Sequence, residues 1–216
     1  MISKNKLVKK LQGFNCLNGF EFVEKEDGVC WKKIDDNREL SLFIGFNGYP
    51  GRYSLQTPIA FIKFQEIENK IIYFSKKLGI NINKADYTIK NKSLENSDFE
   101  YSVFETRIDN KHIFDKVFKA EKQYIQKSIL PFFEKYQDLN NVAELLSTLK
   151  PQEVVPYIQG PKLFCKTILI LKEAKHPNYK SKRDEFYEVL KKQATKKEVY
   201  AQQLQLFELL FFTRQS

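Results

Sequence analysis

The sequence predicts an α+β fold: an antiparallel sheet of about four or five strands, helices on one face, and a mainly helical C-terminal half. Two observations predict it. Before residue 65, apolar and polar residues alternate over short runs; beyond it, apolar residues mostly recur at helical spacing. No internal repeat or low-complexity linker is found. We therefore interpret residues 1–216 as one domain, with 1–109 mainly sheet plus two helices and 110–216 mainly helical.

The first half contains most of the strand signals. Residues 3–12 predict a short helix that ends near Gly13, and residues 65–79 predict a longer one closed by Gly79. Between them, "FEFVEKEDGVCWKKI" predicts a hairpin turning at Asp27-Gly28, because a tight turn favours glycine. Strands are also expected at 38–46 and 58–64. The first of these has one apolar face, formed by Leu40, Leu42, Ile44 and Phe46.

The rest of the chain is predicted to be helical after two weaker segments. Residues 80–98 indicate a loop or weak strand, and 99–108 an edge strand. A long helix is expected over 110–130, ended or kinked by Pro131, and further helices follow it. The run "TILIL" at 167–171 fits either a helix or a buried strand.

Composition indicates a cytoplasmic protein. Three widely spaced cysteines without a C-x-x-C pair are typical of free thiols in a reducing compartment. The lysine-rich N-terminus is not followed by the apolar run of a signal peptide, and no stretch is apolar enough to cross a membrane. We therefore expect no membrane association.

The net charge of +9 is unevenly distributed. Its excess is concentrated in residues 162–197, which suggests a nucleic-acid-binding surface as one alternative function. The basic residues are nearly all lysine, whereas arginine makes the bidentate contacts that read bases. The segment also contains acidic residues at helical spacing, so we expect nucleic-acid binding to be weak at most.

No catalytic, cofactor-binding or metal-binding residues can be assigned. His112 and His176 are the only histidines, and neither lies in a catalytic or zinc-binding signature. Glu24 and Glu26 share one strand face without a third ligand nearby, which is typical of a solvated face. A hydrolase or nuclease with a site assembled from distant residues stays open as a further alternative.

The stretch "IGFNGYPGRYS" at 44–54 contains three glycines at even spacing. A phosphate-binding loop would be followed by a helix, but here a strand follows. Pro50-Gly51 is typical of a type II turn, so the stretch is predicted to connect two strands. Tyr49, Arg52 and Tyr53 flank this turn and are residue types common at interfaces. They are our candidates for binding a partner.

A further stretch brings a family resemblance. A helix leading to "PFFEKY" at 131–136, with the earlier Gly13-Phe14 and a hairpin carrying Trp31, resembles certain small bacterial α+β domains of unknown function. The resemblance covers residues 1–150 and implies the fold, since that family has no assigned activity. The longer helical C-terminal part departs from its pattern.

These observations together favour a non-enzymatic cytoplasmic protein that binds another protein, such as an immunity-type or accessory factor. No cofactor is expected. The last helix has a broad apolar face built around Leu204, Phe207, Leu210 and Phe211. That face would be buried in the core or against a second copy of the chain.

Overall fold

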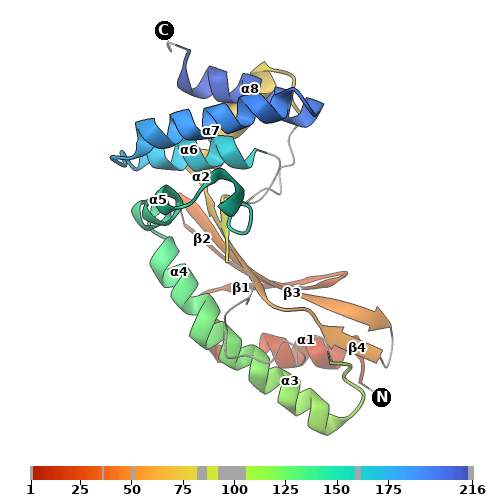
Figure 1. Cartoon of the computed structure of the whole chain (residues 1–216). Coiled ribbons are helices and arrows are strands. Elements are labelled where there is room, and N and C mark those ends of the chain that lie inside the picture. The colour runs from red at the N-terminus through yellow and green to blue at the C-terminus, as the bar shows by residue number, and fades with distance from the viewer. Residues whose placement is uncertain are drawn as a thin grey trace. The chain divides into compact units, whose positions relative to one another are not determined.

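The structure, a computed structural model, describes residues 2–35, 37–49, 52–81, 87–91, 106–158 and 162–213 (Figure 1). In these residues the fold is α+β, as predicted: a six-stranded antiparallel sheet and a helical C-terminal half. The strands are β1 (Glu21–Lys25), β2 (Gly28–Asp35), β3 (Arg38–Tyr49), β4 (Arg52–Leu55), β5 (Ile59–Phe64) and β6 (Ile89–Lys90). The α-helices are α1 (Lys4–Gln12), α2 (Gln65–Lys77), α3 (Lys111–Tyr124), α4 (Leu130–Tyr136), α5 (Leu139–Thr148), α6 (Leu163–Glu173), α7 (Tyr179–Ala194) and α8 (Glu198–Phe211).

The strand order is β1-β2-β3-β5-β6, with β4 paired to β3. The chain forms two compact units: Met1–Phe61 with Asn91–Glu134, and Ile62–Lys90 with Lys135–Ser216. Strand β5 begins in the first unit and ends in the second. The interpretation of the chain as one domain stays a prediction.

The first hairpin forms where it was predicted, but its turn is one residue earlier. Lys25 pairs with Gly28, so Glu26 and Asp27 connect the strands and Gly28 is already part of β2. Gly28 also pairs with Gly45 on β3, and a Cβ atom at Gly28 would overlap the Ile44 carbonyl oxygen. This position therefore requires glycine because of the close approach of β3, and not because of the turn.

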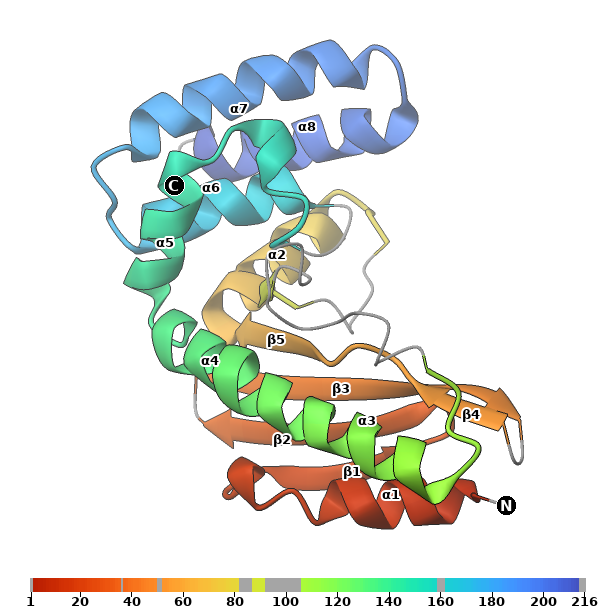
Figure 2. The same ribbon diagram turned by 60° about the horizontal axis from the view of Figure 1, so that its bottom comes forward.

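The core of the first unit lies between one sheet face and helices α1 and α3. In Figures 1 and 2 both helices lie on the same face of β1 to β4. Trp31 on β2 is 2% exposed and stacks on Phe14, with ring centroids 6.4 Å apart. Phe14 in turn contacts Phe118 of α3 edge to face. Leu42 and Ile44 on β3, fully buried, line the predicted apolar strand face.

The long helix neither ends nor simply kinks at Pro131. After α3 the chain forms one π-helical segment, Ile125–Ile129, and continues as α4. Leu130 N–H donates to the Ile125 carbonyl, five residues back. Pro131 has no N–H and would crowd a carbonyl four residues earlier in a regular α-helix. The wider π turn lies at that place, which lets the helical path continue through the proline.

The second unit is built around α6, which is almost completely buried and contacts α2, α5, α7 and α8. Residues 167–171 belong to this helix, so the ambiguous "TILIL" run is helical. Helix α2 ends just before Gly79, as predicted. On α8, Phe207, Leu210 and Phe211 are buried against the other helices, whereas Phe212, the residue after the helix, is 45% exposed.

Two further predictions concern the edge strand at 99–108 and the absence of a membrane-spanning segment. The expected edge strand at 99–108 lies mostly outside the described residues; at its end, Ile108 forms an isolated bridge with Tyr53. In the described part of the chain, none of the helices has the length and apolar character needed to span a bilayer.

Candidate anion-binding groove

The three predicted partner-binding residues lie on the β3–β4 hairpin but do not form one surface. Tyr49 pairs with Arg52, so residues 50 and 51, the predicted turn, connect the strands and lie outside the described residues. Tyr53 pairs with Gly48 and therefore lies on the opposite strand face from the exposed Arg52. The side chain of Tyr49 lies outside the described part of the chain.

Tyr53 and Gly48 serve the hairpin itself. Tyr53 is half-buried, and its carbonyl accepts a hydrogen bond from Ile108 N at 2.7 Å. Gly48 has a φ of +108°, and a Cβ atom there would overlap the Arg52 carbonyl oxygen. Gly45 and Gly48 are both residues of β3, so the strand runs further into the glycine-containing stretch than was predicted.

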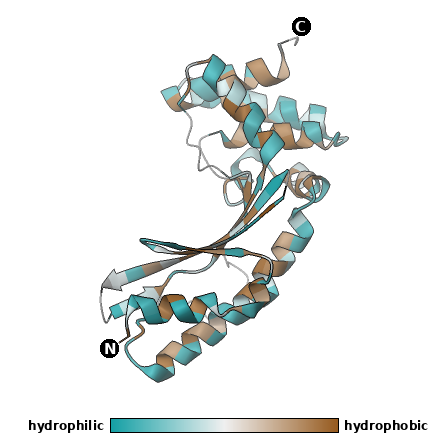
Figure 3. Cartoon of the chain, turned by 180° about the vertical axis from the view of Figure 1, so that it is seen from behind, coloured by the Kyte–Doolittle hydropathy of each residue, from teal (hydrophilic) through white to brown (hydrophobic). Residues whose placement is uncertain are grey.

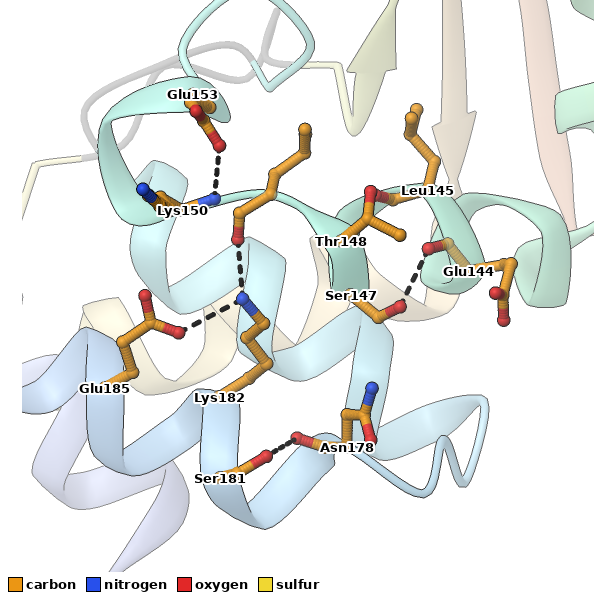
Figure 4. A network of polar contacts seen from close by, with 11 residues as sticks. Glu144, Leu145, Ser147, Thr148, Lys150, Glu153, Asn178, Ser181, Lys182 and Glu185 are labelled. Atoms are coloured by element: carbon orange, nitrogen blue, oxygen red, sulfur yellow. Dashed lines mark hydrogen bonds and ion pairs between the residues drawn. The ribbon is translucent and has the colours of Figure 1, made fainter.

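The basic segment 162–197 does not form a uniform charged surface. Its lysines are distributed over α6, α7 and their flanking residues, and several make structural contacts. Lys182 on α7 donates to the Leu149 carbonyl at 2.8 Å and pairs with Glu185 at 3.1 Å (Figure 4). Lys191 pairs with Glu188 at 2.7 Å. These contacts reduce the charge that the segment can offer to a nucleic acid.

Lys166 of this segment is part of a buried network in the second unit. It is 0% exposed, and its Nζ lies 3.0 Å from Glu68 Oε2 and donates to the Tyr87 carbonyl at 2.9 Å. Thr88 Oγ1 donates to Glu68 Oε1 at 2.7 Å. The network links α2, α6 and the segment containing β6. It is closed to solvent, so its charges act on the fold and cannot contact a substrate.

The feature of the first unit best suited to binding is an open groove between α1 and α3. Its volume is about 500 Å³, within the range of ligand-binding clefts. Lys9 and Lys10, from the last turn of α1, line it together with Lys119 and Lys122 from α3. Figure 3 shows α1 as an alternation of hydrophilic and hydrophobic residues, in keeping with a helix that buries one face only.

The spacing of residues on each helix explains how the groove forms. On α1, Leu7, Val8 and Leu11 are buried, which turns the adjacent lysines to the rim. On α3, Asp115, Lys119 and Lys122 follow one another at helical spacing and share a face. Phe14 and Phe118 form the floor of the groove at 7% and 2% exposure.

The electrostatics of the groove are positive. Among the described residues, none of the four groove lysines has an ion-pair partner within 4.0 Å, and Asp115 is the only acidic residue in the lining. Lys122 also acts on the nearby Cys16. Burial raises the pKa of that thiol, and a backbone hydrogen bond and the Lys122 charge oppose the rise only in part. Cys16 is therefore a poor nucleophile.

Nothing in the sequence around the groove lysines indicates that they form a binding site. Two of them close a short amphipathic helix and two lie on a helix more than one hundred residues away, and each pair alone is typical of a solvated helix face. Only the packing of both helices on one sheet face brings the pairs together. The four side chains were therefore missed as a site.

Other chemistry is sparse in the described ranges. They contain no group of three His, Cys, Asp or Glu side chains able to hold a metal ion. His176 Nε2 lies 3.1 Å from Glu144 Oε2, and its Nδ1 accepts from Asn178 N at 3.2 Å, which fixes the ring at a helix junction. Comparisons with protein-family models, curated proteins and solved structures found no match to this chain.

Proposed function

We propose that this chain is a binding protein whose first unit recognises an acidic segment of another protein through the groove between α1 and α3. The observation that carries the proposal is the convergence of Lys9, Lys10, Lys119 and Lys122 on one groove without ion-pair partners among the described residues. Like charges gathered along one groove repel one another, and carboxylates from a partner would relieve that repulsion. Binding of this kind is compatible with an immunity-type or accessory role for the protein.

The composition of the groove favours protein carboxylates over nucleic-acid phosphates. Proteins that hold single strands stack the bases on exposed aromatic rings, whereas Phe14 and Phe118 are nearly inaccessible. The described lining of the groove includes no arginine to make bidentate phosphate or base contacts, and Asp115 would repel a phosphate backbone that runs close to it. A short run of glutamate or aspartate side chains can place its charges at the lysines and leave Asp115 exposed to water.

The test measures binding of a fluorescently labelled deca-glutamate peptide by anisotropy at physiological salt. The variant replaces all four groove lysines with glutamine. Four exposed ion pairs at about 0.5 kcal/mol each correspond to about 2 kcal/mol, or a loss of roughly thirtyfold in affinity. The matched control has the same net charge and replaces four exposed lysines of the second unit: Lys76, Lys192, Lys196 and Lys197.

We expect the control to bind nearly as the parent does, because none of its four replaced lysines lines the groove. Equal losses in both variants would show that binding follows net charge and not the groove. Tight binding of a DNA duplex that the groove variant abolishes would instead replace this proposal with a nucleic-acid function. Circular dichroism of each variant controls for loss of helix α1, whose last-turn lysines favour the helix dipole.

A further inference from the structure

Strand β1 is the first strand of the sheet order, and Figure 2 shows it at the margin of the sheet. Among the described residues it pairs with β2 alone. Because the hairpin turn has two residues, Lys25 and Gly28 form a hydrogen-bonded pair, and hydrogen-bonded and non-hydrogen-bonded pairs alternate from there. Phe22 and Glu24 belong to the non-hydrogen-bonded pairs. Their main-chain N–H and C=O groups therefore point away from β2, toward the outer edge.

An edge strand can pair with another strand, and proteins usually limit such pairing with prolines, bulges or charged side chains. Strand β1 has no proline, and its five residues pair with β2 without a bulge. Its protection consists of charge: Glu21, Glu24 and Lys25 are exposed, whereas Phe22 and Val23 are half-buried. Charges of both signs exclude many strands, so their order decides which strand can pair with this edge.

The order of residues in β1 makes the strand complementary to itself. When two copies pair antiparallel about Val23, Glu21 of each copy lies opposite Lys25 of the other. The main-chain groups of Phe22 then meet those of Glu24, which also point outward. Glu21 and Lys25 form non-hydrogen-bonded pairs, in which opposing side chains are closest. Moving the register by one residue in each copy toward the turn would instead place Glu24 opposite itself.

Both charges are available for such a pair. Among the described residues, neither Glu21 nor Lys25 has an ion-pair partner within 4.0 Å. Lys32, which lies across from Glu21 on β2, pairs with Glu39 at 3.0 Å. The Lys25 ammonium lies 5.7 Å from the centroid of the Phe43 ring, a contact that does not neutralise its charge. A second copy would supply the opposite charge to both residues.

We propose that two copies of this chain pair through β1 and form a symmetric dimer with one continuous sheet. Phe22 N–H donates to the Glu24 carbonyl of the second copy, Glu24 N–H donates to its Phe22 carbonyl, and the symmetry repeats both bonds. Two Glu21–Lys25 pairs flank this centre. An interface of one short strand is small, so the dimer forms in a concentration-dependent way. It does not depend on the lysine groove between α1 and α3.

Sedimentation velocity over a concentration series, up to the solubility limit, measures the dimer. Glu21→Lys places two lysines opposite each other, and Lys25→Glu places two glutamates opposite each other. Each variant should dimerise at least about tenfold more weakly than the parent, because two symmetry-related pairs change from attraction to repulsion. An equimolar mixture of the two variants should recover the dimer, since every pair across the mixed interface is then attractive. The double variant Glu21→Lys with Lys25→Glu should recover it as well.

Glu26→Lys is the matched control, because it changes the net charge as Glu21→Lys does at an exposed turn position outside the paired residues. It should dimerise as the parent does, and circular dichroism should show each variant folded. A dimer that survives both single reversals, or a mixture that stays monomeric, would overturn the proposal. So would a monomeric parent. Slow hydrogen exchange at the Phe22 and Glu24 amides of that monomer would then assign the edge to another segment of this chain, and fast exchange would leave it to water or a different protein.

Discussion

The buried ion pair of Lys166 and Glu68 makes the sharpest prediction about the fold. The two side chains are 0% and 3% exposed, and their contacts include the ion pair between them, the Thr88 hydroxyl and the Tyr87 carbonyl. Lys166→Met keeps much of the side-chain volume and removes the ammonium. The carboxylate of Glu68 then keeps Thr88 as a donor and loses its counter-charge, and the Tyr87 carbonyl loses the Lys166 donor.

The size of the effect follows from this geometry. At 3.0 Å, two unit charges attract by about 5 kcal/mol with an effective dielectric constant of about 20. Their desolvation offsets much of that gain, so the pair adds little net stability. Removing one partner leaves an uncompensated buried charge, which typically costs about 3–5 kcal/mol. We therefore expect Lys166→Met to lower the free energy of unfolding by about that amount.

Urea unfolding followed by circular dichroism measures these differences. The double variant Lys166→Met with Glu68→Met removes both charges, and we expect it to recover all but about 1–2 kcal/mol of the loss. Lys192→Met, at an exposed position of α7, should change stability by no more than about 0.5 kcal/mol. The reasoning fails if Lys166→Met lowers the free energy of unfolding by less than about 1 kcal/mol. It also fails if the stability losses of Lys166→Met and Glu68→Met simply add in the double variant.

Two further predictions concern the first unit. Glu121 on α3 is 0% exposed, neither of its carboxylate oxygens has a hydrogen-bond partner, and burial raises its pKa well above the usual range. The folded state then holds a proton that the unfolded state releases, so stability falls as pH rises above about 4.5. Glu121→Gln should remove that fall and raise the urea midpoint near neutral pH, with little change near pH 4; an unchanged pH profile would contradict this. On the hairpin, a variant with alanine at Tyr49, Arg52 and Tyr53 should lose partner binding if these residues recognise a protein. Because Tyr53 is half-buried, the same variant should also lower the melting temperature, and single Arg52→Ala, at an exposed position, separates the two effects.

Local periodicity was enough to predict much of the fold. The alternation at Leu40, Leu42 and Ile44 identifies a strand with one buried face, and the structure confirms it. The end of helix α2 just before Gly79 was also predictable, because a glycine that follows a helical apolar stripe can adopt the left-handed conformation that ends a helix. The turn of the first hairpin was predicted one residue too late, because glycine is favoured both by a tight turn and by the close approach of a neighbouring strand. Gly28 was assigned to a turn, whereas the approach of β3 requires it.

The charged residues show why the site was harder to predict than the fold. Lys166 belongs to the basic segment 162–197, and the distribution of charge along the chain does not indicate that its side chain is buried. Its partner Glu68 is almost one hundred residues away, and only the packing of α2 against α6 makes a buried lysine tolerable there. The lysines of the groove show the reverse case. Lys9 and Lys119 look like ordinary solvated residues until α1 and α3 are placed on one face of the sheet. A net charge can thus be read from a sequence, but whether a given lysine stabilises a core or is available to a partner depends on contacts between distant segments.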